Sequence, residues 1–325
     1  MGTAHDLSLG HSGAHTGGMT QLTPHIWCNR TAEEAADLYS RSFRQVREIA
    51  RSHYPTEDLP DFQKSFAGQV VSLELEVHGC PVGFINADDT FRPNPAAGFM
   101  VHISTAHVDD PTAYIDEIHD QLIDGGTALM PLGEYPFSPR YAWIEDRLGV
   151  SWQLFVSPDD APPRPFLVPA LLFSGQAQNR CAEAVVTYTS LFPGAEAGAV
   201  ATYPEPTGPA RAGDVMFSEM RLGPEGDDPT REPWVTAMDS GVEQPFTFTE
   251  WFSLMVRVRD QEEIDRLWDV LSTVPEKEAC GWCCDEYGVS WQIVPEDIDA
   301  IMEIPGAHQR MLQMKKLDIA ALRGE

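Results

Sequence analysis

Basic residues and long apolar runs are scarce in this sequence. Its 325 residues include 22 Lys and Arg against 50 Asp and Glu, which gives a formal net charge of −28. A surface of that sign repels phosphate groups, so nucleic acid and anionic membrane surfaces are not expected partners. No uninterrupted apolar run approaches the length of about twenty residues that spans a bilayer, so no transmembrane helix is expected.

The N-terminal residues 1–20 lack both the basic start and the apolar core of a secretory signal. They are rich in Gly, His, Ser and Thr, and we expect a flexible tail or an artificial leader rather than a folded segment. We interpret His5, His11 and His15 as part of that tail and not as a metal site.

Cysteines are few for a chain of this length, and no secretory signal accompanies them. The six cysteines therefore predict free thiols in a reducing cytoplasm. Cys280, Cys283 and Cys284 form a C-x-x-C-C cluster, but no second close pair exists to complete a zinc or redox site. We expect this cluster to belong to a strand and a turn.

A duplication organises the chain. Residues 143–155 read WIEDRLGVSWQLF and residues 282–294 read WCCDEYGVSWQIV, which share a Trp, an Asp three residues later and the string GVSWQ. Each copy predicts a β-hairpin with a Gly-centred turn. In the first copy Trp152 alternates with Gln153, so the tryptophan is predicted to face the core and the amide the opposite side, where a sheet would line a cavity.

Hydrophobic periodicity predicts an α+β fold of repeated units. In the first half we expect strands over 22–28, 70–77 and 82–87, and a helix over 32–43 that begins with a capping box of Thr31 and Glu34. Residues 44–64 are polar and carry two prolines, which predicts an irregular excursion. A strand over 99–104, a helix over 111–122 and three further strands follow.

The second half repeats this order and ends in a predicted helix over 307–322. Each half is thus expected to hold two strand-helix-three-strand units. The predicted boundaries are a tail at 1–20, a first domain at 21–157, a Pro- and Asp-rich linker at 158–164 and a second domain at 165–325.

Three strings resemble the PhnB-like family of the vicinal-oxygen-chelate superfamily, which includes glyoxalase I, bleomycin-resistance proteins and extradiol dioxygenases. They are TPHIWCNRTAEEAADLYSRSF, CGWCCDEYGVSWQIVP and MLQMKKLDIAALRGE, and the resemblance covers about residues 22–325. It implies tandem glyoxalase-like modules, with four βαβββ units that bend mixed sheets into cups and helices outside. Members are often labelled 3-demethylubiquinone-9 3-methyltransferase. Because the chain has no G-x-G-x-x-G loop, we interpret that label as inherited.

The resemblance also implies positions for a metal on the strands that line a cup. Carried over to this sequence they are His25, a position near Asn86, His102 and Gln153. Of these, His25, His102 and Gln153 share the predicted cup face and form the candidate site for a divalent metal such as Zn, Ni, Mn or Fe. At Asn86 and Gln153 this sequence has amides where glyoxalase-like enzymes have carboxylates, so the negative charge that would hold a catalytic dication is missing there. Glu74 and Glu76 on the neighbouring strand are the carboxylates that would compensate for this loss.

A second interpretation treats these residues as hydrogen-bonded cup residues that brace the sheet. The candidate substrate-binding residues are then Trp27, Asn86 and Gln292. In the second half the corresponding positions are Leu171, Met255 or Ser253, and Gln292, which cannot form a metal site. Trp152 and Trp291 are expected in the core.

Two functions remain open from the sequence. The first is a protein that binds a small molecule in an acid-poor cup, its specific activity unassigned, with the acidic shell favouring a cationic ligand. The alternative is a metal-dependent lyase, isomerase or dioxygenase that uses His25 and His102. The second half can also replace the partner subunit of a dimeric ancestor, which predicts an intrachain pseudo-dimer. Whether the chain is a monomer or a homodimer, and whether cups form within or between halves, stays open.

Overall fold

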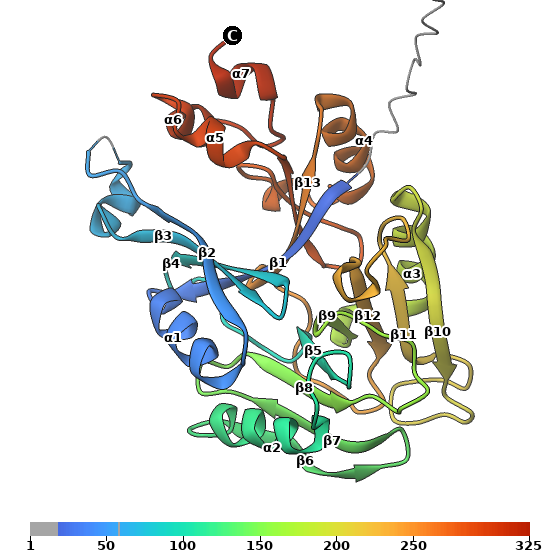
Figure 1. Ribbon diagram of the computed structural model, residues 1–325. Helices are drawn as coiled ribbons and strands as arrows, with labels where there is room; N and C mark the ends of the chain where they lie inside the picture. The colour runs from blue at the N-terminus through green and yellow to red at the C-terminus, as the bar shows by residue number, and fades with distance from the viewer. Residues whose placement is uncertain (1–18, 58) are drawn as a thin grey trace, which may run out of the picture.

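The structure, a computed structural model, describes residues 19–57 and 59–325 (Figure 1). The predicted tail therefore lies outside the described residues, apart from residues 19 and 20, which begin the first strand; the three tail histidines lie outside them as well.

The first half contains two complete βαβββ units. The first unit comprises β1 (Met19–Asn29), α1 (Ala32–Ser42), β2 (Val46–His53), β3 (Val70–Val77) and β4 (Cys80–Ala87). The second comprises β5 (Ala97–Ile103), α2 (Pro111–Leu122), β6 (Thr127–Tyr135), β7 (Ser138–Glu145) and β8 (Ser151–Val156). This confirms the predicted order of elements apart from β2, which lies in the segment that was predicted to be irregular.

The second half repeats the pattern with one difference. Its first unit comprises β9 (Leu167–Phe173), α3 (Cys181–Leu191), β10 (Glu196–Thr202), β11 (Val215–Arg221) and β12 (Trp234–Asp239). Its second comprises β13 (Phe252–Val258), α4 (Gln261–Leu271), β14 (Trp282–Cys284) and β15 (Ser290–Pro295), with a short 3₁₀ turn (Pro275–Lys277) in place of a strand after the helix. The helices α5 (Ile298–Met302), α6 (Ala307–Met311) and α7 (Ile319–Arg323) end the chain.

Each of the two sheets combines one unit from each half. Sheet A has the strand order β14-β15-β13-β1-β4-β3-β2, and sheet B has the order β10-β11-β12-β9-β5-β8-β7-β6. The halves meet where β1 pairs with β13 and β5 pairs with β9, both antiparallel. The cups thus form between halves, which the sequence left open.

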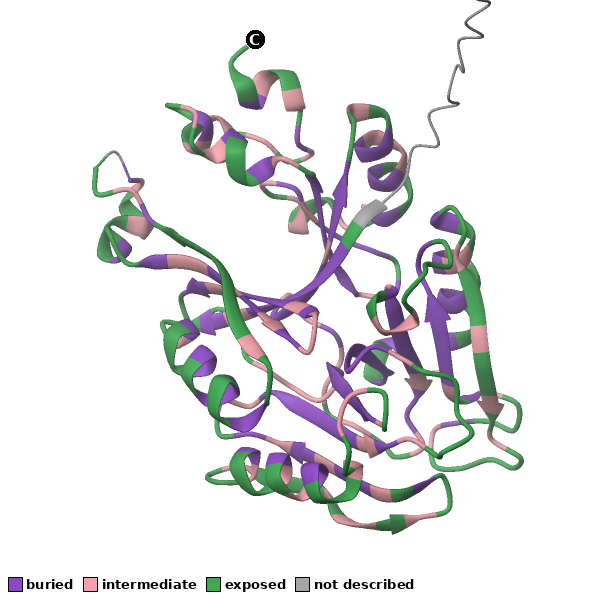
Figure 2. Ribbon diagram, viewed as in Figure 1, coloured by how far each residue is buried: buried purple, intermediate pink, exposed green. Residues whose placement is uncertain are grey.

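The four long helices cover one face of each sheet and leave the other face, here called the cup face, away from them (Figure 1). Trp152 and Trp291 lie on the helix-covered side and are almost fully buried, as predicted. The rings of Phe99 on β5 and Phe252 on β13 are 5.4 Å apart, so the two sheets share one core. The inner strands are buried, and the edge strands β2, β6 and β10 are largely exposed (Figure 2).

Several local predictions were wrong. The excursion at 44–64 contains β2. In the first unit of the second half only one strand after the helix was predicted, over 215–221, so β10 and β12 were also missed. Because β2 and β10 are edge strands with exposed side chains along most of their length, they show no apolar alternation. Thr31 precedes α1 but makes no side-chain cap, and the single C-terminal helix is broken between α6 and α7. No helix of the described residues is long and apolar enough to cross a membrane.

Candidate functional site

His25 lies at the centre of the cup face of sheet A. In β1 it stands opposite Gly83 of β4 and Ser253 of β13. Its ring covers Gly83, where a Cβ would lie 2.1 Å from the imidazole. The residue is 2% exposed, and burial lowers the pKa of the imidazole to about 4, so it is neutral at pH 7. Nδ1 is 3.2 Å from the carbonyl oxygen of Thr23 and, as the N–H tautomer, donates to it.

A chain of charged groups continues from this imidazole. Its Nε2 lies 3.8 Å from Oε1 of Glu74, and the same oxygen lies 3.3 Å from Nη2 of Arg257. Nη1 of Arg257 in turn lies 3.0 Å from Oδ2 of Asp299 on α5. Burial raises the pKa of Glu74, and the neighbouring guanidinium opposes that rise. The guanidinium of Arg257 therefore already neutralises the carboxylate of Glu74 beside His25.

Aromatic and amide groups lie further along the same face. The rings of Trp27 and Trp282 are 6.2 Å apart and nearly perpendicular, and Phe91 is 5.1 Å from Trp27. Trp282 is opposite Gln292 on the neighbouring strand, and Nε2 of Gln292 donates to Oγ of Ser253 at 2.8 Å. Both tryptophans are only partly buried. Sheet A thus gathers three predicted site residues, His25, Trp27 and Gln292, from both halves.

Two hydroxyl groups of this face have no hydrogen-bond partner within the described part of the chain. They are Oγ1 of Thr23, one alternation before His25, and Oγ of Ser290, one alternation before Gln292. A buried hydroxyl without a partner is costly, so each of these strands carries an unfavourable polar group on this face.

The remaining candidates lie elsewhere. His102 and Gln153 are on the cup face of sheet B, where Oε1 of Gln153 accepts a hydrogen bond from Tyr141 at 3.1 Å. Burial lowers the pKa of His102 to about 4. Asn86 points to the helix side of β4, where it accepts from the amide of Ala32 and donates to the carbonyl of Val70.

The structure consequently does not bring the candidate metal residues together, because His25 is in sheet A while His102 and Gln153 are in sheet B. Among the residues that the structure describes, no group of three or more His, Cys, Asp or Glu side chains is placed to hold a metal ion. Glu76, the second carboxylate considered, is held by a bidentate contact with Arg47 at 2.7 and 2.8 Å. The donor set does not fit a divalent metal.

Two cavities of about 500 and 460 Å³ lie apart from His25, and Trp234 of β12 lines the larger one. The larger is lined by the first strands of the two halves and by the loop over 223–233, and both share Glu76, Gly79, Asp228 and Arg231. Neither contains His25, Trp27 or Gln292. They mark the junction of the two sheets rather than the candidate site.

Comparison with known proteins identifies the family. The family model described as 3-demethylubiquinone-9 3-methyltransferase matches the chain twice, over residues 20–155 and 165–294. The chain belongs to this family. The predicted resemblance to PhnB-like proteins of the vicinal-oxygen-chelate superfamily is thereby confirmed. No curated protein matches the chain.

The chain is also similar to solved structures. A putative 3-demethylubiquinone-9 3-methyltransferase, the PhnB protein from Bacillus cereus, is 29% identical and covers 42% of this chain and 98% of its own, with a TM-score of 0.35. Glyoxalase I from Zea mays is 12% identical, covers 89% of this chain and 95% of its own, and has a TM-score of 0.50. The maize structure shows the shared fold.

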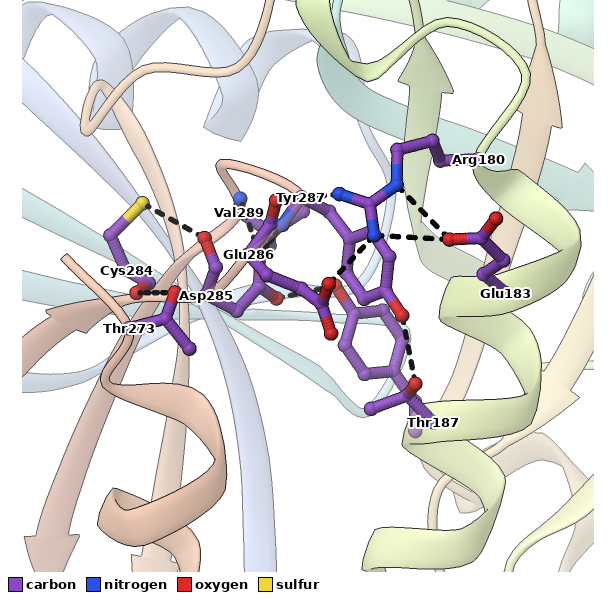
Figure 3. A network of polar contacts seen from close by, with 10 residues as sticks. Arg180, Glu183, Thr187, Thr273, Cys284, Asp285, Glu286, Tyr287 and Val289 are labelled. Atoms are coloured by element: carbon purple, nitrogen blue, oxygen red, sulfur yellow. Dashed lines mark hydrogen bonds and ion pairs between the residues drawn. The ribbon is translucent and has the colours of Figure 1, made fainter.

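Sequence reasoning missed one pair of residues that this family member carries in both copies of the repeat, Asp146 and Asp285. Each is 3% exposed and follows the repeated Trp by three positions. The segment around Asp285 connects to α3, where Arg180 contacts Glu183 and Glu286 and the hydroxyls of Thr187 and Tyr287 are 2.8 Å apart (Figure 3). The signal in the sequence that could have found this pair is the occurrence of the Asp at the same position in both copies.

Proposed function

We propose that this protein binds a small organic molecule on the cup face of sheet A, between Trp27, Trp282 and Gln292. The observation that carries the proposal is the edge-on pair of partly buried tryptophans beside an amide and a hydroxyl, on strands from both halves. Aromatic faces bind planar apolar groups, and a few convergent polar groups fix their orientation.

The chemistry of the face favours a neutral or cationic ligand. His25 is uncharged at pH 7, and Arg257, a cation beside it, lies between two carboxylates. The net charge of −28 repels anions over the whole molecule. We further propose a cytoplasmic monomer, since the cysteines of the described residues are free thiols and the halves complete each other's sheets.

The alternative, a metal-dependent lyase, isomerase or dioxygenase, has less support. It needs His25 and His102 at one ion, and these residues belong to different sheets. Metal analysis after dialysis tests this alternative directly. About one tightly held Zn, Ni, Mn or Fe per chain, lost in the variant His25→Ala, would restore it. The transferase reaction in the family's description is likewise not proposed, because the sequence has no loop for a nucleotide-like cofactor.

A ligand screen with matched variants tests the proposed site. Thermal shifts are measured for a panel of planar heteroaromatic compounds that are cationic, neutral or anionic. We expect hits among the first two classes whose shift falls at least fivefold in Trp27→Ala and in Gln292→Ala. The control is Trp143→Ala, which removes a partly buried tryptophan from the cup face of sheet B. Compounds that stabilise all of these proteins equally would place binding elsewhere.

A further inference from the structure

The linker between the halves sends one side chain onto the cup face of sheet B. Arg164 lies between Pro163 and Pro165, directly before β9. Its Nε donates to Oε2 of Glu219 at 3.0 Å and its Nη2 donates to Oε1 of the same carboxylate. The centre of its guanidinium lies 3.8 Å from the ring centroid of Trp234. The contact is therefore a bidentate ion pair with an aromatic face stacked against it.

Both groups that hold this guanidinium are parts of the rigid sheet. Glu219 is on β11 and Trp234 is on the neighbouring β12, and they are 7% and 8% exposed. A carboxylate buried to this extent needs either a cation or several hydrogen-bond donors, and Arg164 supplies the cation here. Arg164, which supplies the cation, comes from a Pro- and Asp-rich linker without a helix or strand. Glu219 and Trp234 are therefore the fixed receptor in the sheet, and Arg164 is the variable occupant.

A third group of the same face is unsatisfied. His102 on β5 is 6% exposed, and its Nε2 has no hydrogen-bond partner among the described residues. Burial is the main cause of its lowered pKa, while the charge of Glu219 acts in the opposite direction, which places the two groups within electrostatic reach. Arg164 thus satisfies Glu219 and Trp234, while Nε2 of His102 makes no hydrogen bond within the described residues.

We infer that sheet B carries a subsite for the planar cationic group of a small ligand, a guanidinium or an amidinium, and that Arg164 is an internal occupant which such a ligand displaces. Glu219 accepts two parallel N–H bonds, Trp234 covers the plane of the cation, and His102 is free to bond a further polar atom of the ligand. A spherical ammonium ion cannot donate two parallel bonds to the paired acceptors while it presents a flat face to the ring. This subsite is separate from the site proposed on sheet A.

Removal of the internal occupant tests the inference. In Arg164→Ala, ethylguanidinium supplies the atoms that the variant lacks, and we expect it to bind at least tenfold more tightly than to the unaltered protein, where the tethered side chain competes at a high effective concentration. Ethylammonium should bind the variant at least fivefold more weakly than ethylguanidinium. Binding is followed by isothermal titration and by the fluorescence of Trp234 and its neighbours.

Two further variants make the result specific. Glu219→Gln in the Arg164→Ala background should abolish the gain in ethylguanidinium binding. Arg140→Ala is the matched control, because it empties an ion pair with Asp116 that has no stacked ring, and it should show no gain. Arg164→Gln carries the test if the alanine variant does not fold. Equal affinity of the altered and unaltered proteins for ethylguanidinium, or equal affinity for the two cations, would overturn the inference.

Discussion

The hydroxyl of Tyr188 on α3 donates a hydrogen bond of 2.5 Å to Oδ2 of Asp285, which lies in the turn before β15. The first half repeats this pair, since Tyr39 on α1 donates to Oδ2 of Asp146 at 2.9 Å. In each half the helix belongs to one sheet and the aspartate to the other. The repeated aspartate therefore ties the two sheets together.

Loss of this anchor should destabilise the protein strongly. Asp285 also accepts from the indole of Trp291 and from two backbone amides, so Asp285→Ala leaves several buried donors unpaired and should cost about 3–5 kcal/mol of the free energy of unfolding. Tyr188→Phe removes one bond and should cost about 1–2 kcal/mol. Urea denaturation measures both. Tyr135→Phe, with an exposed hydroxyl bond, is the control, and an equal effect there would contradict the anchor role.

Stability should fall as the pH falls from 7 to 5, in part because of His25. Burial lowers its pKa from 6.5 to about 4, so the unfolded chain takes up a proton first and the contribution to stability, complete above about pH 6.5, is lost as the pH falls toward 4. Between pH 7 and 5 this amounts to about 2 kcal/mol.

Other groups also contribute to the pH dependence of stability. Burial raises the pKa of Asp285 to about 6, and this carboxyl stabilises the folded protein as the pH falls. A comparison of variants is therefore needed to isolate the contribution of His25. His25→Asn should remove about 2 kcal/mol of the pH dependence measured by urea denaturation. His53→Asn on the exposed strand β2 is the matched change. Unaltered pH dependence in His25→Asn would show that the imidazole is protonated in the folded state as easily as in the unfolded chain.

The sequence predicted the duplication, the order of the elements other than the missed strands β2, β10 and β12, and the core tryptophans, because these depend on local patterns and on a repeated string. It could not predict which units pair with each other. The strands β1 and β13 are far apart in the sequence, and no local pattern encodes their pairing. For the same reason His25 and His102 were assigned to one site. Asn86 was assigned to a cup, although its register with Cys28 places it on the helix side.

The exchange of units between halves predicts how the chain responds to a cut in its linker. Co-expressed fragments 1–159 and 160–325 should purify as a one-to-one complex, because each fragment alone exposes the unpaired edges of β1 and β5 or of β9 and β13. The uncut chain should sediment as a 36.0 kDa monomer, since its sheets are complete. Fragments that purify separately as stable monomers would contradict the pairing of units across the halves.

Gly83 should be required only while His25 is present. In Gly83→Ala the new Cβ would meet the imidazole at 2.1 Å, and forcing the ring from its place should cost about 1–3 kcal/mol. In a His25→Ala background the same substitution should cost little, because the methyl group enters space that the ring has left. Gly98→Ala provides the contrast, since its Cβ would lie 2.3 Å from the backbone oxygen of Ser151, which no truncation at position 25 can relieve. A double-mutant cycle by urea denaturation measures the coupling, and additive costs at Gly83 and His25 would mean that the ring does not lie on the glycine.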